Sequence, residues 1–308
     1  TIAVPLGVIA GIIPSTNPTS TTFYKALISI KAGNAIVFSP HPQAKRCIME
    51  SVKVIKQAIS EAGGNEDLVG CISMPTMQAT ESLMRHPHVA LILATGGAAM
   101  VRAAYSSGNP AIGVGPGNGP SFIERSADLK EAVAQVVASK TFDNGMICAS
   151  EQSVICTDDY RGEVRAEMER QGCYFLDDAE RAQLGRYILR ANGTMNPEIV
   201  GKSAQAIAKL AGLTIPDGTK IIVAPEDGVG YGHPYSNEKL APILAFYSAP
   251  DYKAVCEKCE EILHYEGAGH TFSIHSQNEE IVSYFSARVP VSRIVVNAGS
   301  TLGAIGAT

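Results

Sequence analysis

The chain has 308 residues and a formal net charge of -5 at pH 7, and 18% of its residues are charged. It holds no block of basic residues and no apolar run near the roughly 20 residues of a membrane span, so neither nucleic acid nor a membrane is expected as a partner. The first residues lack the charged start and the cleavage site of a secretory signal, which makes the cytoplasm the expected location. The length suggests about two domains, and the low charge content favours extensive buried surface or an oligomer interface.

The first half of the sequence alternates between expected strands and helices. Apolar runs predict strands at 4–13, 35–38, 68–73, 89–94 and 111–114. Helical spacing predicts helices at 19–30, 43–62, 76–85 and 98–105, the first with Thr19 or Ser20 as its N-cap. This alternation implies parallel strands joined by right-handed crossovers.

The second half repeats the pattern. Strands are expected at 153–156, 220–224, 243–247, 271–274 and 293–296, and helices at 128–140, 159–171, 179–189, 204–211, 252–264 and 279–287. We place the domain boundary near Asp143–Gly145, which gives domains 1–143 and 144–308. The chain starts inside an expected strand and stops without a closing element, so we expect a fragment of a longer protein.

Cys148 is the leading candidate for a reactive group among the seven cysteines. It follows the turn Asp143-Asn-Gly145 and precedes the polar Ser150-Glu-Gln152, where a thiol can be exposed and mobile, as a nucleophile requires. The other six cysteines are expected to be small buried side chains, and the odd total of seven cysteines argues against a disulfide framework. The pair Cys256 and Cys259 offers only two ligands and no histidine pair has metal-ligand spacing, so we expect no metal site.

Three single residues also qualify as site candidates. Asn17 lies in Pro14–Pro18, after the first expected strand, at the edge where open α/β sheets bind ligands. Its amide can donate to a developing oxyanion, although Asn17-Pro18 can equally be a turn that starts a helix. Glu238 could hold a ribose hydroxyl or be a solvated surface residue. His270 could be a site residue or a capped core histidine.

Two glycine-rich turns allow a ligand to approach the backbone. The segment 94–98 follows an expected strand and opens a helix, where backbone N–H groups can meet a phosphate. It is not G-x-G-x-x-G, so the motif alone is weak. The segment 113–120 is denser in glycine, with tight packing as the alternative explanation.

In combination and in this order, seven segments resemble the aldehyde dehydrogenase superfamily. The closer resemblance is to its CoA-acylating (acetaldehyde) branch, which includes the aldehyde-oxidising half of bifunctional aldehyde–alcohol dehydrogenases. The matching segments cover most of the chain and are 4–18, 38–42, 93–97, 104–108, 111–118, 140–152 and 238–242.

The resemblance implies a fold of two doubly wound α/β domains, a Rossmann-like cofactor domain and a catalytic domain, in a homo-oligomer. It implies NAD, or NADP, as cofactor and coenzyme A as co-substrate, in the cytoplasm or in a bacterial microcompartment. It assigns the cofactor to Ser15, Thr16, Ser39, His41, Thr95, Gly96, Gly97, Gly115 and Glu238.

The resemblance also implies a two-step reaction. The Cys148 thiolate attacks an aldehyde, and Asn17 and the Cys148 N–H stabilise the oxyanion. Hydride passes to the nicotinamide, and coenzyme A then releases acyl-CoA from the thioacyl-enzyme in a reversible step. His270 is the candidate for a substrate contact. Acetaldehyde is the expected substrate, with propionaldehyde, butyraldehyde and succinate semialdehyde as alternatives.

Two departures from the hydrolytic members favour the acylating branch. Those enzymes carry a Glu-Leu-Gly-Gly segment whose glutamate activates water, and the matching stretch here is Val114-Gly-Pro-Gly117. Ser39, followed by His41, stands where they have a lysine near the adenosine ribose. An acyl-phosphate reductase of the same fold and a truncated, non-catalytic nucleotide-binding module remain as alternatives.

Overall fold

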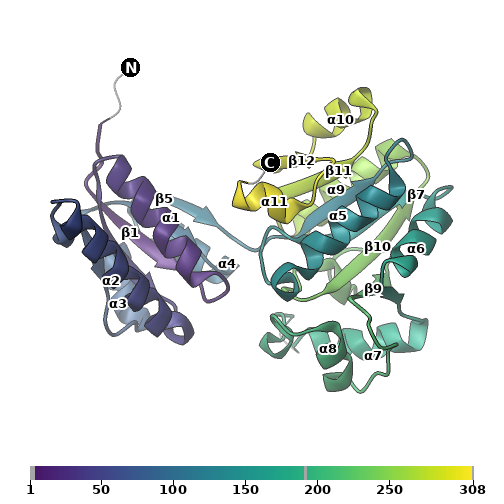
Figure 1. The fold of residues 1–308 in the computed structure, drawn as a ribbon, viewed down its shortest axis with the longest axis horizontal. Coiled ribbons are helices and arrows are strands. Elements are labelled where there is room, and N and C mark those ends of the chain that lie inside the picture. Colours follow the sequence, from purple (N-terminus) through teal and green to yellow (C-terminus); the bar gives the residue numbers. More distant parts are fainter. Residues whose placement is uncertain (1–3, 191–192, 307–308) are drawn as a thin grey trace. The chain divides into compact units, whose positions relative to one another are not determined.

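The computed structural model describes residues 4–190 and 193–306. The chain forms two compact units, residues 1–115 and residues 116–308 (Figure 1). Each unit is an α/β structure built on one parallel sheet, which confirms the expected fold class.

The first unit contains a five-stranded parallel sheet with the order β3-β2-β1-β4-β5. The chain runs outward from β1 in one direction to β3 and in the other to β5, so the order reverses between β1 and β4. The strands are β1 (Val8–Ile13), β2 (Ala35–Pro40), β3 (Val69–Cys71), β4 (Val89–Thr95) and β5 (Ala111–Val114).

Helices cover both faces of this sheet. They are α1 (Pro18–Lys31), α2 (Lys45–Glu61), α3 (Met77–Met84) and α4 (Ala98–Tyr105), with short 3₁₀ turns at Pro42–Ala44 and Glu66–Leu68. Alternate residues of β1 face opposite sides: Ile9 and Ile13 pack with α1 and α2, whereas Ala10 and Ile12 pack with α3 and α4. A strand buried on both faces accounts for the continuous apolar run at the start of the chain.

The second unit contains a seven-stranded parallel sheet with the order β12-β11-β6-β7-β10-β9-β8. Its strands are β6 (Gly119–Ile123), β7 (Glu151–Thr157), β8 (Cys173–Phe175), β9 (Ile221–Pro225), β10 (Ile243–Ala249), β11 (Thr271–His275) and β12 (Arg293–Val296). The central strands β6, β7 and β10 are almost completely buried.

Helices again lie on both faces of the sheet. They are α5 (Leu129–Thr141), α6 (Arg161–Arg170), α7 (Asp178–Ile188), α8 (Ala204–Leu210), α9 (Tyr252–Tyr265), α10 (Glu279–Ser286) and α11 (Ser300–Ile305), with 3₁₀ turns at Phe142–Gly145, Pro197–Ile199 and Pro234–Ser236. Helices α5 and α6 share one core cluster with the sheet, and α7 to α10 share the other. In Figure 1, α5 crosses the front of this sheet.

The division between the units differs from the boundary expected near Asp143–Gly145. Strand β6 pairs with β7 and β11, and α5 packs on the same sheet, so residues 116–143 belong to the second unit. The glycine and proline at the start of β6 made this strand look like a turn in the sequence. Strand β8 and the closing helix α11 were also not expected.

The start of α1 corrects another expectation. The helix begins at Pro18, which places Asn17 at the N-cap and both Thr19 and Ser20 inside the first turn. Proline is favoured at the first helical position because its ring presets φ and its missing N–H would have no helical partner there. Within residues 4–190 and 193–306, no helix has the length and apolar character to cross a bilayer.

Candidate active site

The Cys148 loop joins α5 to β7 and contains a left-handed turn. Asp143 and Asn144 both have φ of 50°, a conformation that Asp and Asn adopt more readily than most residues. The Asn144 amide donates to the carbonyl oxygen of Gly201 at 3.0 Å, and Ser150 N donates to the carbonyl oxygen of Ile147 at 2.9 Å. The turn that the sequence indicated before Cys148 therefore exists, and side-chain and backbone bonds fix it.

The Cys148 thiol is half-buried, not fully exposed as the sequence suggested. Burial raises the pKa of Cys148 to about 11, and the nearby carboxyl of Glu238 adds to this effect. Arg293 acts in the opposite direction, more weakly. A thiol with this pKa is protonated near pH 7, so attack on a carbonyl needs a proton acceptor or a local change on substrate binding.

Cys148, Glu238 and His270 come together around the backbone of Gly117. Gly117 N donates to Oε1 of Glu238 at 2.7 Å. A Cβ atom at Gly117 would overlap the carbonyl oxygen of Cys148 and lie 3.2 Å from Cε1 of His270. Only glycine allows the chain to pass here, which gives this glycine of the dense 113–120 turn a packing role.

The four residues of this cluster share one edge of the second sheet. Gly117 precedes β6, Cys148 precedes β7, Glu238 precedes β10 and His270 precedes β11. Because these strands are parallel, the segments before them meet at the amino edge of the sheet. Ligands in open α/β sheets usually bind at the carboxyl edge, so the cluster lies opposite the edge that topology alone would predict.

The His270 imidazole is a half-buried neutral group. Burial, assisted by Arg293, lowers the pKa of His270 to about 4. Its Nδ1 lies 3.1 Å from Oγ1 of Thr271, and its Nε2 is buried with no hydrogen-bond partner among the residues that the structure describes. A neutral imidazole with one unpaired nitrogen can accept or donate a proton at the site.

The Glu238 carboxyl is a second titratable group beside the thiol. Burial raises the pKa of Glu238 to about 8, and Glu266 also raises it, whereas the hydrogen bond from Gly117 and the lysines Lys140 and Lys239 lower it. Glu238 N in turn donates to the Glu266 carboxylate at 2.7 Å. Glu238 is therefore part of a buried network, and the alternative of a solvated surface residue is wrong.

Two buried lysines support this network, and sequence reasoning overlooked them. Lys140 and Lys239 are 0% and 1% exposed. Oε1 of Gln152 accepts from Lys140 Nζ at 3.2 Å and from Lys239 N at 3.1 Å. Lys239 Nζ donates to the carbonyl oxygens of Tyr235 and Asn237 at 2.6 and 2.7 Å. The network ties the Glu238 segment to the ends of the Cys148 loop.

The remaining candidates belong to the first unit and lie at the carboxyl edge of its sheet. Ser15, Thr16 and Asn17 follow β1, and Thr95, Gly96 and Gly97 follow β4, the strand beside it. Lys25 is buried beneath them and donates from Nζ to the carbonyl oxygens of Ile12 and Leu93 at 2.8 and 2.7 Å. Lys25 thus joins β1 to β4 where the strand order reverses, the usual place of a ligand crevice.

The Asn17 amide is placed to interact with something other than its own helix. Its side chain makes no capping bond to α1, although its Oδ1 accepts from the Thr16 hydroxyl at 3.3 Å. Among residues 4–190 and 193–306, no hydrogen bond of its Nδ2 is formed. If Asn17-Pro18 served only as a turn that starts the helix, the N–H groups of the Asn17 amide would have no role.

The other first-unit candidates differ in how accessible they are. The Ser39 hydroxyl is buried and paired with that of Thr80 at 2.7 Å, and Nδ1 of His41 accepts from Gln43 N at 3.3 Å. A Cβ atom at Gly97 or Gly115 would meet no atom within 4 Å. The two glycines border open space that a ligand can use, whereas the Ser39 side chain is already engaged.

A cavity of about 480 Å³ in the second unit lies away from the thiol. Its lining comes from α5, the Cys148 loop, the end of α6, the start of α8 and the turn before β9, and comprises Ala134, Val137, Ala138, Thr141, Asn144, Gln171, Ser203, Ala204, Thr219 and Lys220. Cys148, Glu238 and His270 are not among these residues, so this cavity is separate from the cluster.

Comparison with known proteins decides the family. Residues 1–230 match the model of the aldehyde dehydrogenase family. The chain belongs to the aldehyde dehydrogenase family. It is 46% identical over 309 aligned residues to the bifunctional aldehyde-alcohol dehydrogenase AdhE of Escherichia coli, covering 99% of this chain and 35% of that protein. The chain thus spans about a third of the length of this curated relative of the aldehyde dehydrogenase family.

Solved aldehyde dehydrogenases share the structure closely. A probable aldehyde dehydrogenase from Listeria monocytogenes is 59% identical, with a TM-score of 0.97 over 100% of this chain and 68% of that one. A propionaldehyde dehydrogenase from Rhodopseudomonas palustris, solved with bound CoA and an acylated cysteine, is 30% identical, with a TM-score of 0.89 over 97% of this chain and 68% of that one.

Proposed function

We propose that the chain carries out NAD(P)-dependent, CoA-acylating oxidation of a small aldehyde, with acetaldehyde as the preferred substrate. The observation that carries the proposal is the cluster at the amino edge of the second sheet, where the Cys148 backbone, Glu238 and His270 gather around Gly117 and the Glu238 carboxyl acts on the Cys148 thiol. The acylated cysteine and the CoA of the Rhodopseudomonas relative support it, because they combine the same fold with this chemistry.

In this proposal the first unit holds the cofactor and the second unit provides the nucleophile. The open space at Gly97 and Gly115 fits a dinucleotide that approaches the backbone, with Ser15, Thr16, Thr95 and Gly96 beside it. When bound, the nicotinamide accepts the hydride. Ser39, with its hydroxyl engaged, contributes through its position near the carboxyl end of β2, together with His41, which follows the strand.

The Cys148 sulfur forms a bond to the aldehyde carbon, and its proton passes to a neighbouring acceptor. Neutral His270 is the candidate acceptor, because it borders Gly117 together with Cys148 and its Nε2 is unpaired in the described structure. The Asn17 amide and the Cys148 N–H stabilise the oxyanion. Loss of hydride leaves a thioester on Cys148, and the thiol of coenzyme A displaces the cysteine to give acyl-CoA and the free thiol.

The site does not favour water as the acceptor. The stretch Val114–Gly117 holds no acid, and Glu238 accepts the Gly117 N–H. Because burial raises the pKa of Glu238 to about 8, its carboxyl is mostly protonated at pH 7, and only the ionised fraction can accept a proton from water. A thioester in such a site reacts more readily with a thiol than with water, because a thiol is the better nucleophile.

The proposal includes a homo-oligomer in the cytoplasm, which rests on the family resemblance and on the low charge content of the chain. Kinetic assays of the purified chain would also decide between NAD and NADP and between acetaldehyde and longer aldehydes. Initial rates with each cofactor and with aldehydes of two to four carbons would rank them.

The decisive test follows nicotinamide reduction by the purified chain with acetaldehyde, with and without coenzyme A, and identifies the product. We expect sustained turnover and acetyl-CoA only when coenzyme A is present, and none with Cys148→Ser. Turnover that requires phosphate and yields an acyl phosphate would instead support the acyl-phosphate reductase. Cofactor binding without any reduction would support a nucleotide-binding module.

A further inference from the structure

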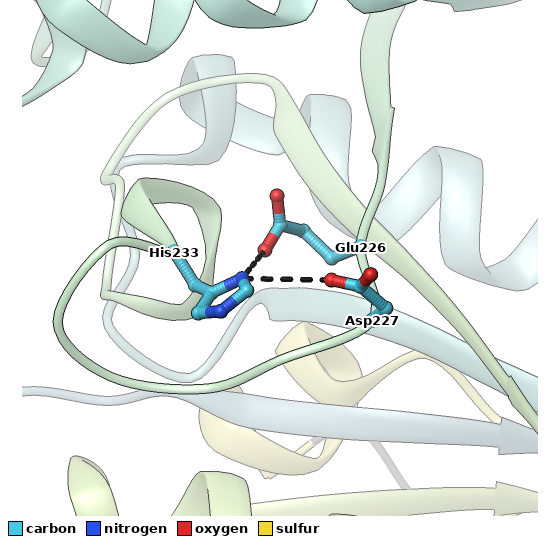
Figure 2. Close-up of side chains that lie close together, drawn as sticks. All are labelled: Glu226, Asp227 and His233. Atoms are coloured by element: carbon cyan, nitrogen blue, oxygen red, sulfur yellow. Dashed lines mark hydrogen bonds and ion pairs between the residues drawn. The ribbon is translucent and has the colours of Figure 1, made fainter.

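A second group of ligand-type side chains lies in the loop between β9 and β10, at the opposite strand end from the Cys148 cluster. Glu226 and Asp227 directly follow β9, and His233 returns to them from the far side of the loop (Figure 2). Nδ1 of His233 lies 2.8 Å from Oε2 of Glu226 and 3.7 Å from Oδ1 of Asp227. One donor atom from each of the three side chains lies within 4.8 Å of the others.

These separations suit a single small cation. Ligand atoms about 2.0–2.1 Å from a tetrahedral zinc ion lie about 3.3 Å from one another. The observed 2.8 and 3.7 Å fall on either side of that value, and all three donor atoms lie within 4.8 Å of one another, so side-chain adjustment would seat an ion between them. An imidazole nitrogen with two carboxylate oxygens is a donor set that suits zinc better than calcium or magnesium, which favour oxygen ligands alone.

The three side chains differ in burial, and this difference favours binding of a metal ion over a simple ion pair between His233 and Glu226. The side chain of Glu226 is 4% exposed, that of His233 34% and that of Asp227 91%. Glu226 is therefore held in place, and Asp227 leaves an open side for an ion and its water. Burial raises the pKa of Glu226, and His233 and Arg181 offset the rise.

Arg181 already forms an ion pair with the Glu226 carboxylate. Its Nη1 lies 3.6 Å from Oε1 of Glu226, the oxygen that does not face His233. The other guanidinium nitrogen lies 3.4 Å from Oδ1 of Asp178. Arg181 thus occupies one side of Glu226 and leaves Oε2, directed at His233 and Asp227, for a second positive partner.

We propose that Glu226, Asp227 and His233 bind a divalent cation of the zinc class, which fastens the loop between β9 and β10. Binding at Nδ1 displaces the proton shared with Glu226 to solvent, and the ring keeps its hydrogen on Nε2. The sequence-based expectation of no metal site considered histidine and cysteine pairs, whereas this set joins one histidine to two acids within the eight residues 226–233. The proposal does not depend on the proposed catalytic function.

Titration calorimetry with zinc chloride on the whole chain tests the site. We expect the wild-type chain to bind one more zinc ion than His233→Ala, because any thiol-bound zinc is common to both. Glu226→Gln should weaken this extra site at least tenfold. Asp178→Asn is the matched control: it removes an exposed acid beside Arg181 that is no ligand, and zinc binding should stay within twofold. Equal stoichiometry and affinity in the wild-type chain and His233→Ala would overturn the proposal.

Gly228→Ala tests the same site without removing a ligand. A Cβ atom at Gly228 would overlap Nε2 of His233, so the methyl group must push the ring away from the two acids. We expect this variant to lose the extra zinc ion while its far-ultraviolet circular dichroism matches the wild-type chain. Retention of the ion in Gly228→Ala at unchanged affinity would show that His233 is not a ligand.

Discussion

At the scale of single residues, the chemistry of the site depends on how Cys148 loses its proton. The structure surrounds the thiol with groups that oppose ionisation, since burial and the Glu238 carboxyl both raise the pKa of Cys148. This arrangement keeps the free thiol protonated and poorly reactive until a substrate and a proton acceptor are in place. In the proposed reaction, the Cys148 thiol is therefore activated when substrate binds and is not permanently ionised.

The rate at which Cys148 is alkylated should therefore depend on the charge of the neighbouring Glu238 carboxyl. Below the pKa of about 11, the rate of carbamidomethylation should rise about tenfold per pH unit, because the thiolate is the reacting form. Glu238→Gln keeps an amide oxygen for Gly117 N but removes the charge, so it should accelerate alkylation above pH 8, where Glu238 is ionised in the wild-type chain. Peptide mapping by mass spectrometry separates Cys148 from exposed Cys47.

The control for this experiment is Glu257→Gln, which removes an exposed acid on α9. It should leave the rate at Cys148 unchanged at every pH. Equal rates in Glu238→Gln and the wild-type chain at pH 9 would show that the Glu238 charge does not act on the thiol.

Gly117 should tolerate no side chain. In Gly117→Ala the new methyl group would overlap the carbonyl oxygen of Cys148, a backbone atom that cannot rotate away. We expect a loss of about 3 kcal/mol or more in the free energy of unfolding, at the upper end of overpacking costs, together with loss of turnover. Urea denaturation measures the first and nicotinamide reduction the second.

A matched substitution separates steric overlap from a general effect of alanine. Gly162 lies in the first turn of α6, and a Cβ atom there would meet no atom within 4 Å. Gly162→Ala should be neutral or stabilise the chain by up to about 1 kcal/mol, because alanine favours helix over glycine. Similar destabilisation by both substitutions would argue against the close contact at Gly117.

At the scale of elements, α1 begins in a way that leaves the Asn17 side chain without a capping bond. Most helices with a polar N-cap use its side chain to satisfy an N–H of the first turn, as Asp128 does for α5 by accepting from Glu131 N at 3.1 Å. Asn17 occupies the same position in α1 but makes no such bond. Its amide is thus available as an oxyanion donor at the carboxyl edge of β1.

This difference predicts opposite outcomes for two alanine substitutions at helix N-caps. Asn17→Ala should lower kcat by about 10² to 10³, the usual cost of losing an oxyanion donor, while the free energy of unfolding changes by less than about 0.5 kcal/mol because no capping bond is lost. Asp128→Ala should lower the free energy of unfolding by about 1 kcal/mol and leave kcat unchanged. A kcat for Asn17→Ala within twofold of the wild-type value would remove Asn17 from the mechanism.

Much of this element pattern was predictable from the sequence, and the exceptions have physical causes. Regular apolar spacing located most strands and helices, because burial against a sheet imposes it. Strand β6 was missed since Gly119 and Pro120 look like a turn, and only pairing with β7 and β11 makes them a strand. The motif around Cys148 located the loop, but Gly117, which passes against the Cys148 carbonyl, and Glu238, which raises the pKa of the thiol, come from other parts of the sequence.

The buried lysines show a second limit of the sequence. Lys25, Lys140 and Lys239 look like surface residues because lysine is seldom buried. Each is held by oxygen acceptors that the fold supplies: the carbonyl oxygens of Ile12 and Leu93 for Lys25, and the Gln152 side chain for Lys140. Such partners cannot be read from local composition, because they come from other strands and loops.

At the scale of the whole molecule, the two units carry separable tasks in the proposed reaction. The open glycine turns belong to the first unit, and the thiol cluster belongs to the second. A substitution at the thiol should therefore spare cofactor binding. Cys148→Ser should bind NADH with a Kd within twofold of the wild-type chain, measured by NADH fluorescence, while it shows no turnover.

The absence of a water-activating acid in Val114–Gly117 leads to the last prediction, a stalled intermediate. Without coenzyme A, the wild-type chain with acetaldehyde and NAD should reduce about one nicotinamide per active site and then stop, because the thioester on Cys148 has no efficient route to hydrolysis. Rapid-mixing absorbance measures the burst, and intact-mass spectrometry should show an acetyl adduct that peptide mapping places on Cys148. Added coenzyme A should remove the adduct and restart turnover, and Cys148→Ser should show neither burst nor adduct. Steady turnover without coenzyme A would contradict the acylating mechanism, and it would identify an unrecognised base, with Glu238 above pH 8 as the first group to substitute.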